Sequence, residues 1–205
     1  MQPSWTHRPH GEEPDPEFFH RMSPPENEVP VVLPVGRLVA RTADAAVAVT
    51  RLAVYSTGVL LDLVVRARPD TLRMTDLHSM MWRPGDGPPG LLLGLEFADG
   101  TRVDNNRRQG SMDGVTFALQ GGSGNEHSVD QGWWLHPLPP AGPIRLVVRC
   151  TALGIDETSV ELDGDAVRRA ADEVVELWPW TPPRPNDEEP VQRWPEIPGD
   201  SWFAD

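Results

Sequence analysis

Lysine is absent from this chain of 205 residues, and its 18 basic side chains are all arginines. This absence excludes chemistry that needs a lysine amine, such as Schiff-base catalysis and the lysine of a phosphate-binding loop. The acidic excess gives a net charge of -13. Because affinity for a phosphate backbone depends on basic residues that release counterions, we expect no nucleic-acid partner.

Cysteine occurs once, at Cys150, so no disulfide can form within the chain. Cys150 ends an apolar run, which predicts a buried thiol and a reducing compartment. The longest apolar candidate for a membrane span, residues 47–65, is interrupted by Arg51 and Asp62. Residues 1–10 lack the basic and then apolar segments of a secretory signal. Together these absences predict a cytoplasmic protein without a membrane partner.

Short apolar runs with a period of two fill the middle of the chain. In residues 59–67 every odd position is apolar, while Asp62 and Arg66 fall on the other face. The same alternation of apolar residues recurs in residues 33–42, 46–55, 91–97, 115–119, 129–135, 144–150 and 160–162. Turn-forming residues separate these runs, and helices between them are missing. The pattern predicts a mainly β protein, an antiparallel β-sandwich of about eight strands.

Residues 165–178 have the spacing of one C-terminal amphipathic helix, with Val167, Ala170 and Val174 on its apolar face. The two ends of the chain are instead rich in proline and acidic residues. Such composition predicts a disordered acidic arm over residues 1–30 and a Pro/Trp-rich acidic tail over residues 181–205. The sandwich domain with its helix is expected over residues 31–180.

Residue types used by hydrolases are present, but their patterns are incomplete. Ser123, His127 and Asp130 are close in sequence, yet a catalytic triad is defined by a geometry that sequence proximity does not supply. The glycine-rich residues 121–124 precede a strand and not a helix, which favours a hairpin loop over a phosphate site. We therefore assign no catalytic residue, cofactor or metal ligand. The alternative is a hydrolase that uses Glu96, Asp130 or His127, which requires these groups to converge in a cleft.

The adjacent residues Trp133 and Trp134 indicate a binding surface more strongly than these patterns indicate a catalytic site. Neighbouring side chains of a strand point to opposite faces, so one ring enters the core and the other is left for a protein or a sugar. We take Trp134 as the candidate contact residue. The competing interpretation is that the C-terminal helix, Trp178 or Trp180 covers this ring.

The tail holds further aromatic candidates, Trp194, Trp202 and Phe203. Aromatic anchors on a proline-stiffened peptide suit recognition by a groove, so we predict that residues 190–205 bind a protein partner. A tail that wraps its own domain is the alternative. The favoured function is thus a non-catalytic protein-interaction or accessory protein, with a hydrolase or a carbohydrate-binding module as alternatives.

Several motifs follow one another in a fixed order: Trp133-Trp134, Pro139-Pro140-Ala141-Gly142-Pro143, Gly154-Ile155-Asp156-Glu157-Thr158, Leu162-Asp163-Gly164 and an Ala-rich segment that ends in Leu-Trp-Pro. In this succession the chain resembles a group of uncharacterised actinobacterial proteins, over residues 31–180. The resemblance implies an actinobacterial origin and a β-sandwich-like fold, and it implies no activity.

Overall fold

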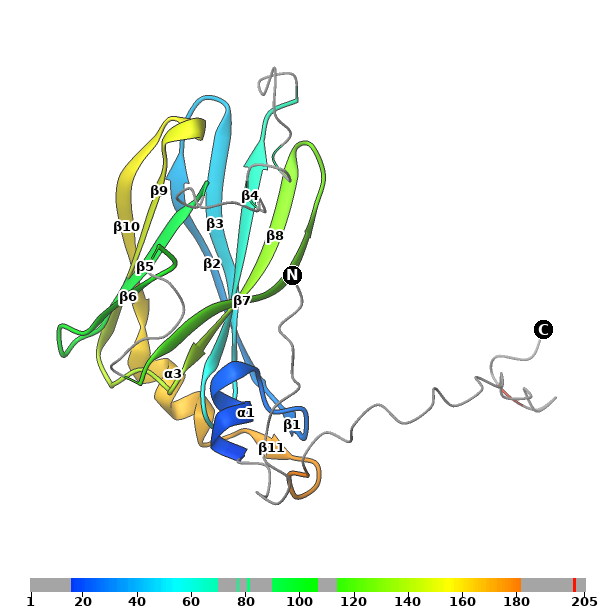
Figure 1. The fold of residues 1–205 in the computed structure, drawn as a ribbon. Coiled ribbons are helices and arrows are strands. Elements are labelled where there is room, and N and C mark those ends of the chain that lie inside the picture. Colours follow the sequence, from blue (N-terminus) through cyan, green and yellow to red (C-terminus); the bar gives the residue numbers. More distant parts are fainter. Residues whose placement is uncertain are drawn as a thin grey trace, which may run out of the picture.

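A computed structural model describes residues 16–69, 77, 81, 90–106, 114–181 and 201. Two antiparallel sheets pack face to face, as Figure 1 shows. The five-stranded sheet has the order β2 (Val31–Arg41), β3 (Ala45–Val54), β4 (Val59–Ala67), β8 (Ser128–His136), β7 (Thr116–Gly124). The four-stranded sheet has the order β10 (Ile155–Asp163), β9 (Pro143–Cys150), β5 (Leu92–Glu96), β6 (Arg102–Asp104). The predicted mainly β sandwich is confirmed.

A third, two-stranded ribbon joins the two chain ends that flank the sandwich. β1 (Glu28–Val29) pairs with β11 (Val175–Glu176) in antiparallel register. With this ribbon the described residues contain eleven strands, more than the eight expected. The difference arises because strands of two or three residues are too short to show an alternating pattern.

The core lies between the two sheets, on the faces that the alternation predicts. Leu61, Leu63 and Val65 of β4 are buried in it, while Asp62 and Arg66 point to the outer face. Cys150 is buried and free, as expected, and burial raises the pKa of its thiol. A buried thiol with a raised pKa packs as a small apolar side chain and is a poor nucleophile.

The helix near the C-terminus is shorter than the sequence pattern predicts. α3 spans Gly164–Ala171, and the Asp163 side chain caps it by accepting a hydrogen bond from the Ala166 amide at 2.9 Å. After a turn, the expected second half of the helix forms β11 instead. Pairing with β1 supplies these residues with hydrogen bonds, and β-branched Val174 and Val175 favour an extended backbone. Tertiary pairing therefore overrides the helical periodicity.

The N-terminal arm is also more ordered than expected over its described part. α1 (Pro16–Met22) lies on the outer face of the five-stranded sheet, against β7 and β8 (Figure 1). Two side chains of the sheet bind its last carbonyls: the Trp134 indole donates to His20 O at 3.0 Å, and Gln120 Nε2 donates to Met22 O at 2.8 Å. These bonds satisfy groups that a helix end leaves free. Within the arm for which the sequence predicts disorder, residues 16–30 thus contain α1 and β1.

The helices of the sandwich are short. Within residues 90–106 and 114–181 the helical elements are α3 and one 3₁₀ turn, η1 (Thr151–Leu153). Across the part of the chain that the structure describes, no helix has the length and apolar character that a membrane crossing requires.

Candidate binding groove

Glu96 does not converge with the other two groups of the hydrolase hypothesis. Glu96 points outward from β5 of the four-stranded sheet, whereas Asp130 points outward from β8 of the other sheet, so both layers of the sandwich separate them. His127 lies in the β7–β8 turn, 3.7 Å from the Glu126 carboxylate. Asp130 pairs with Arg66 at 2.6 Å. Glu96 therefore shares no cleft with Asp130 or His127.

Electrostatics also disfavours Glu96 as an acid or base. Arg102 donates a hydrogen bond to its carboxylate at 2.7 Å, and Arg145 donates another at 3.4 Å. The hydrogen bond from Arg102, with the charges of both arginines, lowers the pKa of Glu96. A carboxylate held ionised by two guanidinium groups neither donates a proton nor accepts one readily at neutral pH.

Trp134 is not the exposed ring that a partner or a sugar would contact. Its ring points away from the core, as the sequence predicts, but its exposed fraction is 0% because α1 covers it. Tyr55 packs edge-on against it, with ring centroids 5.6 Å apart. The carbohydrate-binding hypothesis relied on an exposed Trp134 and loses that support. The C-terminal helix α3 packs instead against β2, β3 and β9.

The other predicted contact residues, Trp194, Trp202 and Phe203, lie outside the described residues. The same holds for the rest of the tail segment 190–205, except Ser201.

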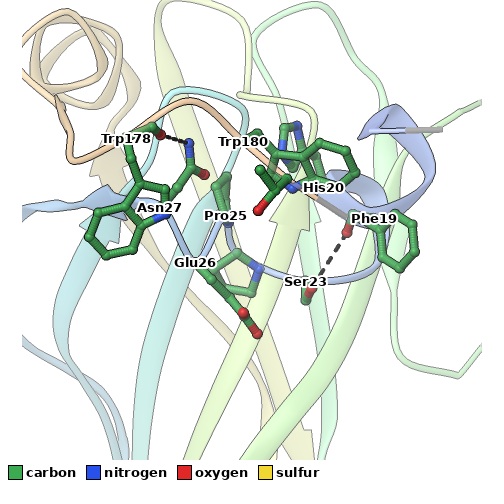
Figure 2. A pocket seen from close by; sticks show the side chains of 10 residues that line it. Phe19, His20, Ser23, Pro25, Glu26, Asn27, Trp178 and Trp180 are labelled. Atoms are coloured by element: carbon green, nitrogen blue, oxygen red, sulfur yellow. Dashed lines mark hydrogen bonds between the residues drawn. The ribbon is translucent and has the colours of Figure 1, made fainter. Parts of the chain in front are cut away.

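A groove opens where the described segments before β1 and after β11 meet (Figure 2). We call it the terminal groove. Its walls come from Phe19 and His20 of α1, residues 23–27 after that helix, and Trp178, Trp180 and Thr181 after β11. Its volume is about 200 Å³. Segments 150 residues apart in sequence thus form one concave surface, next to the β1–β11 ribbon that holds them together.

Aromatic contacts fix one wall of the terminal groove. The Trp180 ring lies against Phe19, with centroids 5.7 Å apart, and against His20, with centroids 5.8 Å apart in an edge-on arrangement. Because α1 is itself held by Trp134, this wall is anchored on β8. The opposite wall is Trp178, and Figure 2 shows Pro25 and Asn27 between the two tryptophans. A rigid aromatic and proline lining of this kind is typical of sites that bind extended peptides.

Asn27 supplies the polar group of the groove. Its Nδ2 donates to Trp178 O at 2.9 Å and to Glu176 Oε1 at 3.4 Å. Both partners are acceptors, so the amide nitrogen must face them and the orientation of the amide is fixed. Oδ1 is then left buried without a hydrogen-bond donor in the described structure. The residue is only 6% exposed, and an unsatisfied buried acceptor costs about 1–3 kcal/mol.

Exposed apolar side chains border the terminal groove. Trp178 is 57% exposed and Val175 is 56% exposed, although both are large apolar residues. Val29, opposite Val175 in the ribbon, and Leu177 are also exposed. Scattered exposed apolar residues are ordinary, but Val29 and Val175 pair in the ribbon and Leu177 precedes the groove residue Trp178, so four exposed apolar side chains lie on the ribbon and the segment after it, which favours a contact surface. We call these four residues the apolar rim.

A second hollow lies on the outer face of the five-stranded sheet, with a volume of about 350 Å³. Its charged residues neutralise one another: Arg66 pairs with Asp130, and Asp62 pairs with Arg51. Because these charges are already paired with each other and exposed to water, they would contribute little binding energy to a charged ligand. It is therefore the weaker of the two candidates.

The fold and the groove together define an antiparallel β-sandwich protein with a concave surface built from the segments that flank the sandwich. Comparison with protein-family models, curated proteins and solved structures gave no match. The resemblance to uncharacterised actinobacterial proteins stays a prediction.

Sequence reasoning missed the terminal groove because it placed residues 1–30 in a disordered arm. The signal for α1 is nonetheless present. Pro16 occupies the first position of the helix, Glu17 lies in its first turn and Arg21 in its last, which suits the helix dipole. Glu17 and Arg21 also form an i,i+4 ion pair at 3.3 Å. No local pattern, however, links this helix to Trp180.

Proposed function

We propose that the protein is a non-catalytic interaction module that binds a partner protein at the terminal groove and the apolar rim. The observation that carries the proposal is the exposure of Trp178, 57%, beside a groove whose other walls are held in place by buried contacts. Tryptophan is the residue type most enriched among the contacts that dominate protein interfaces.

The physical basis is the cost of leaving such a surface in water. Burying apolar area contributes roughly 25 cal/mol per Å², and Trp178, Val175 and Leu177 keep about half of their area exposed in the free protein. A partner that covers the apolar rim removes this area from water. Because the aromatic wall is already fixed by Phe19 and His20, binding loses little additional conformational entropy.

We further propose that the partner is a protein in the cytoplasm and not a nucleic acid. Support comes from the net charge of -13 and from the single cysteine, which is buried and unpaired. An acidic protein repels phosphate backbones and is attracted to basic surfaces.

Affinity purification from the native host with three baits tests the proposal: the wild-type chain, Trp178→Ala and the control Arg149→Ala. Arg149 is exposed on β9 of the four-stranded sheet, away from the groove. We expect the wild-type and control baits to recover the same partner and the Trp178→Ala bait to lose it. Equal recovery by all three baits would contradict a binding site at the groove.

A further inference from the structure

We infer that the terminal groove takes a cationic side chain, the guanidinium or ammonium group of a basic residue in the partner protein. The inference rests on the proposed function and specifies what the groove recognises. Three independent properties of the lining support it: an unpaired acceptor, aromatic walls and the sign of the local charge.

The acceptor is Asn27 Oδ1, which is buried and has no donor in the described structure. Since its amide nitrogen is held by Trp178 O and Glu176 Oε1, the side chain cannot turn to present a donor instead. An N–H or O–H group of a ligand would satisfy this acceptor.

Aromatic walls favour a donor that is also positively charged. Trp178 and Trp180 both line the groove, with Asn27 and Pro25 between them in Figure 2, and Phe19 supports Trp180. The faces of aromatic rings carry negative partial charge and attract ammonium and guanidinium groups, most strongly when the ring is tryptophan. A guanidinium group can stack on such a ring and still donate hydrogen bonds from its edge.

The charge around the groove has the matching sign. Glu26 is exposed and lines the groove, and Glu176 lies next to Asn27. Of the basic residues of α1, His20 lines the groove and packs edge-on against Trp180, and Arg21 is paired with Glu17 at 3.3 Å. The chain as a whole carries a charge of -13, so its field also attracts a basic segment.

The size of the groove sets how much of the partner enters it. A volume of about 200 Å³ is below the range of roughly 300–1,000 Å³ that is typical of sites for drug-sized ligands. The terminal groove therefore holds one side chain, while the apolar rim contacts the residues on either side of it. This division between an anchor and its surroundings is usual for peptide recognition.

Two synthetic peptides separate charge from shape: acetyl-Gly-Arg-Gly-amide and the same peptide with citrulline, the neutral analogue of arginine. Each is titrated into the full-length protein while the tryptophan indole N–H signals are followed by NMR. We expect the arginine peptide to bind at least about tenfold more tightly and to shift a signal that Trp178→Ala removes. Its binding should weaken as NaCl is raised from about 0.05 to about 0.5 M, because salt screens the attraction.

Glu26→Gln removes the charge at the groove with almost no change in shape, and Glu161→Gln on β10 is the matched control. We expect the first variant to lower affinity for the arginine peptide several-fold and the second to leave it unchanged. Equal binding of both peptides, or no binding of either, would overturn the inference. In that case, retention of the partner by wild type and its loss by Trp178→Ala would still support the proposed function.

Discussion

Two pairs of nearby tryptophans, Trp133 with Trp134 and Trp178 with Trp180, differ in their exposure to solvent. Trp133 and Trp134 follow one another on β8, so one ring enters the core and the other faces outward, yet both are buried. Trp178 and Trp180 are separated by one residue after β11. Trp180 is half-buried against α1, while Trp178 stays mostly exposed. The exposure of a tryptophan ring therefore depends on whether another element, such as α1, packs over it, and not on the strand to which the tryptophan belongs.

The comparison assigns different roles to the two pairs. α1 covers Trp134, and the Trp134 indole donates a hydrogen bond to His20 O of α1. The tryptophans of β8 therefore contribute to stability. Trp178 receives no such cover and borders the terminal groove, so it is available for binding. Substitutions at the two sites should therefore separate stability from partner binding.

The largest effect is expected for Trp134→Ala. This change empties a fully buried site beneath α1 and removes the donor to His20 O. Large-to-small substitutions of a buried aromatic residue cost about 3–5 kcal/mol. Urea unfolding followed by circular dichroism measures the loss. A cost below about 1 kcal/mol would show that α1 does not depend on this ring.

Gly58→Ala tests the same site from the turn between β3 and β4. An added Cβ would lie 2.6 Å from the Trp134 ring and would also collide with Leu135 O. Because a backbone atom cannot move away cheaply, we expect a loss of about 1–3 kcal/mol. Gly132→Ala is the control, since its Cβ would make an ordinary contact with Leu60 at 3.4 Å. Equal thermal midpoints for the two variants would contradict the close packing.

A smaller, pH-dependent effect is expected from His136, which is buried at the α1 end of β8 with its Nδ1 unpartnered. Burial lowers the pKa of His136, Arg21 and His20 lower it further, and Glu17 opposes them. Above about pH 6.5 both the folded and unfolded states hold a neutral imidazole and the stability is complete. As the pH falls below that value, only the unfolded state readily binds a proton, so the free energy of unfolding decreases.

His136→Asn removes this titration. Urea unfolding at intervals between about pH 7.5 and 5.5 covers a range in which ordinary Asp and Glu side chains stay ionised. The wild type should lose stability over this range, and the variant should lose less. Parallel curves for the two proteins would show that His136 does not contribute.

The smallest effect on stability is expected for Trp178→Ala, less than about 1 kcal/mol, because the ring is mostly exposed. Differential scanning calorimetry checks this value. Together with loss of the partner, a small change would sharpen the contrast with Trp134. A cost similar to that of Trp134→Ala would mean that Trp178 is structural and would weaken the assignment of the apolar rim.

The β-strands could be predicted because their signal is local. In residues 59–67 the alternation of apolar and polar side chains gives the strand, its buried face and the outward position of Asp62. The half-helix after Ala171 could not be predicted in the same way. Its periodicity fits a helix, but pairing with β1, distant in the sequence, decides its structure.

The sequence by itself determined the sandwich, the burial of Cys150 and the outward direction of Trp134, since each follows from the period of two along a strand. Only the tertiary structure decided that α1 covers Trp134, that Glu96 lies on the other sheet from His127 and Asp130, and that a groove forms between Phe19 and Trp178. The physical reason is that binding surfaces of this kind are made by segments far apart in the chain. The contacts between residues 19–27 and residues 178–181 depend on where the sheets place these two segments, and no local sequence pattern encodes that placement.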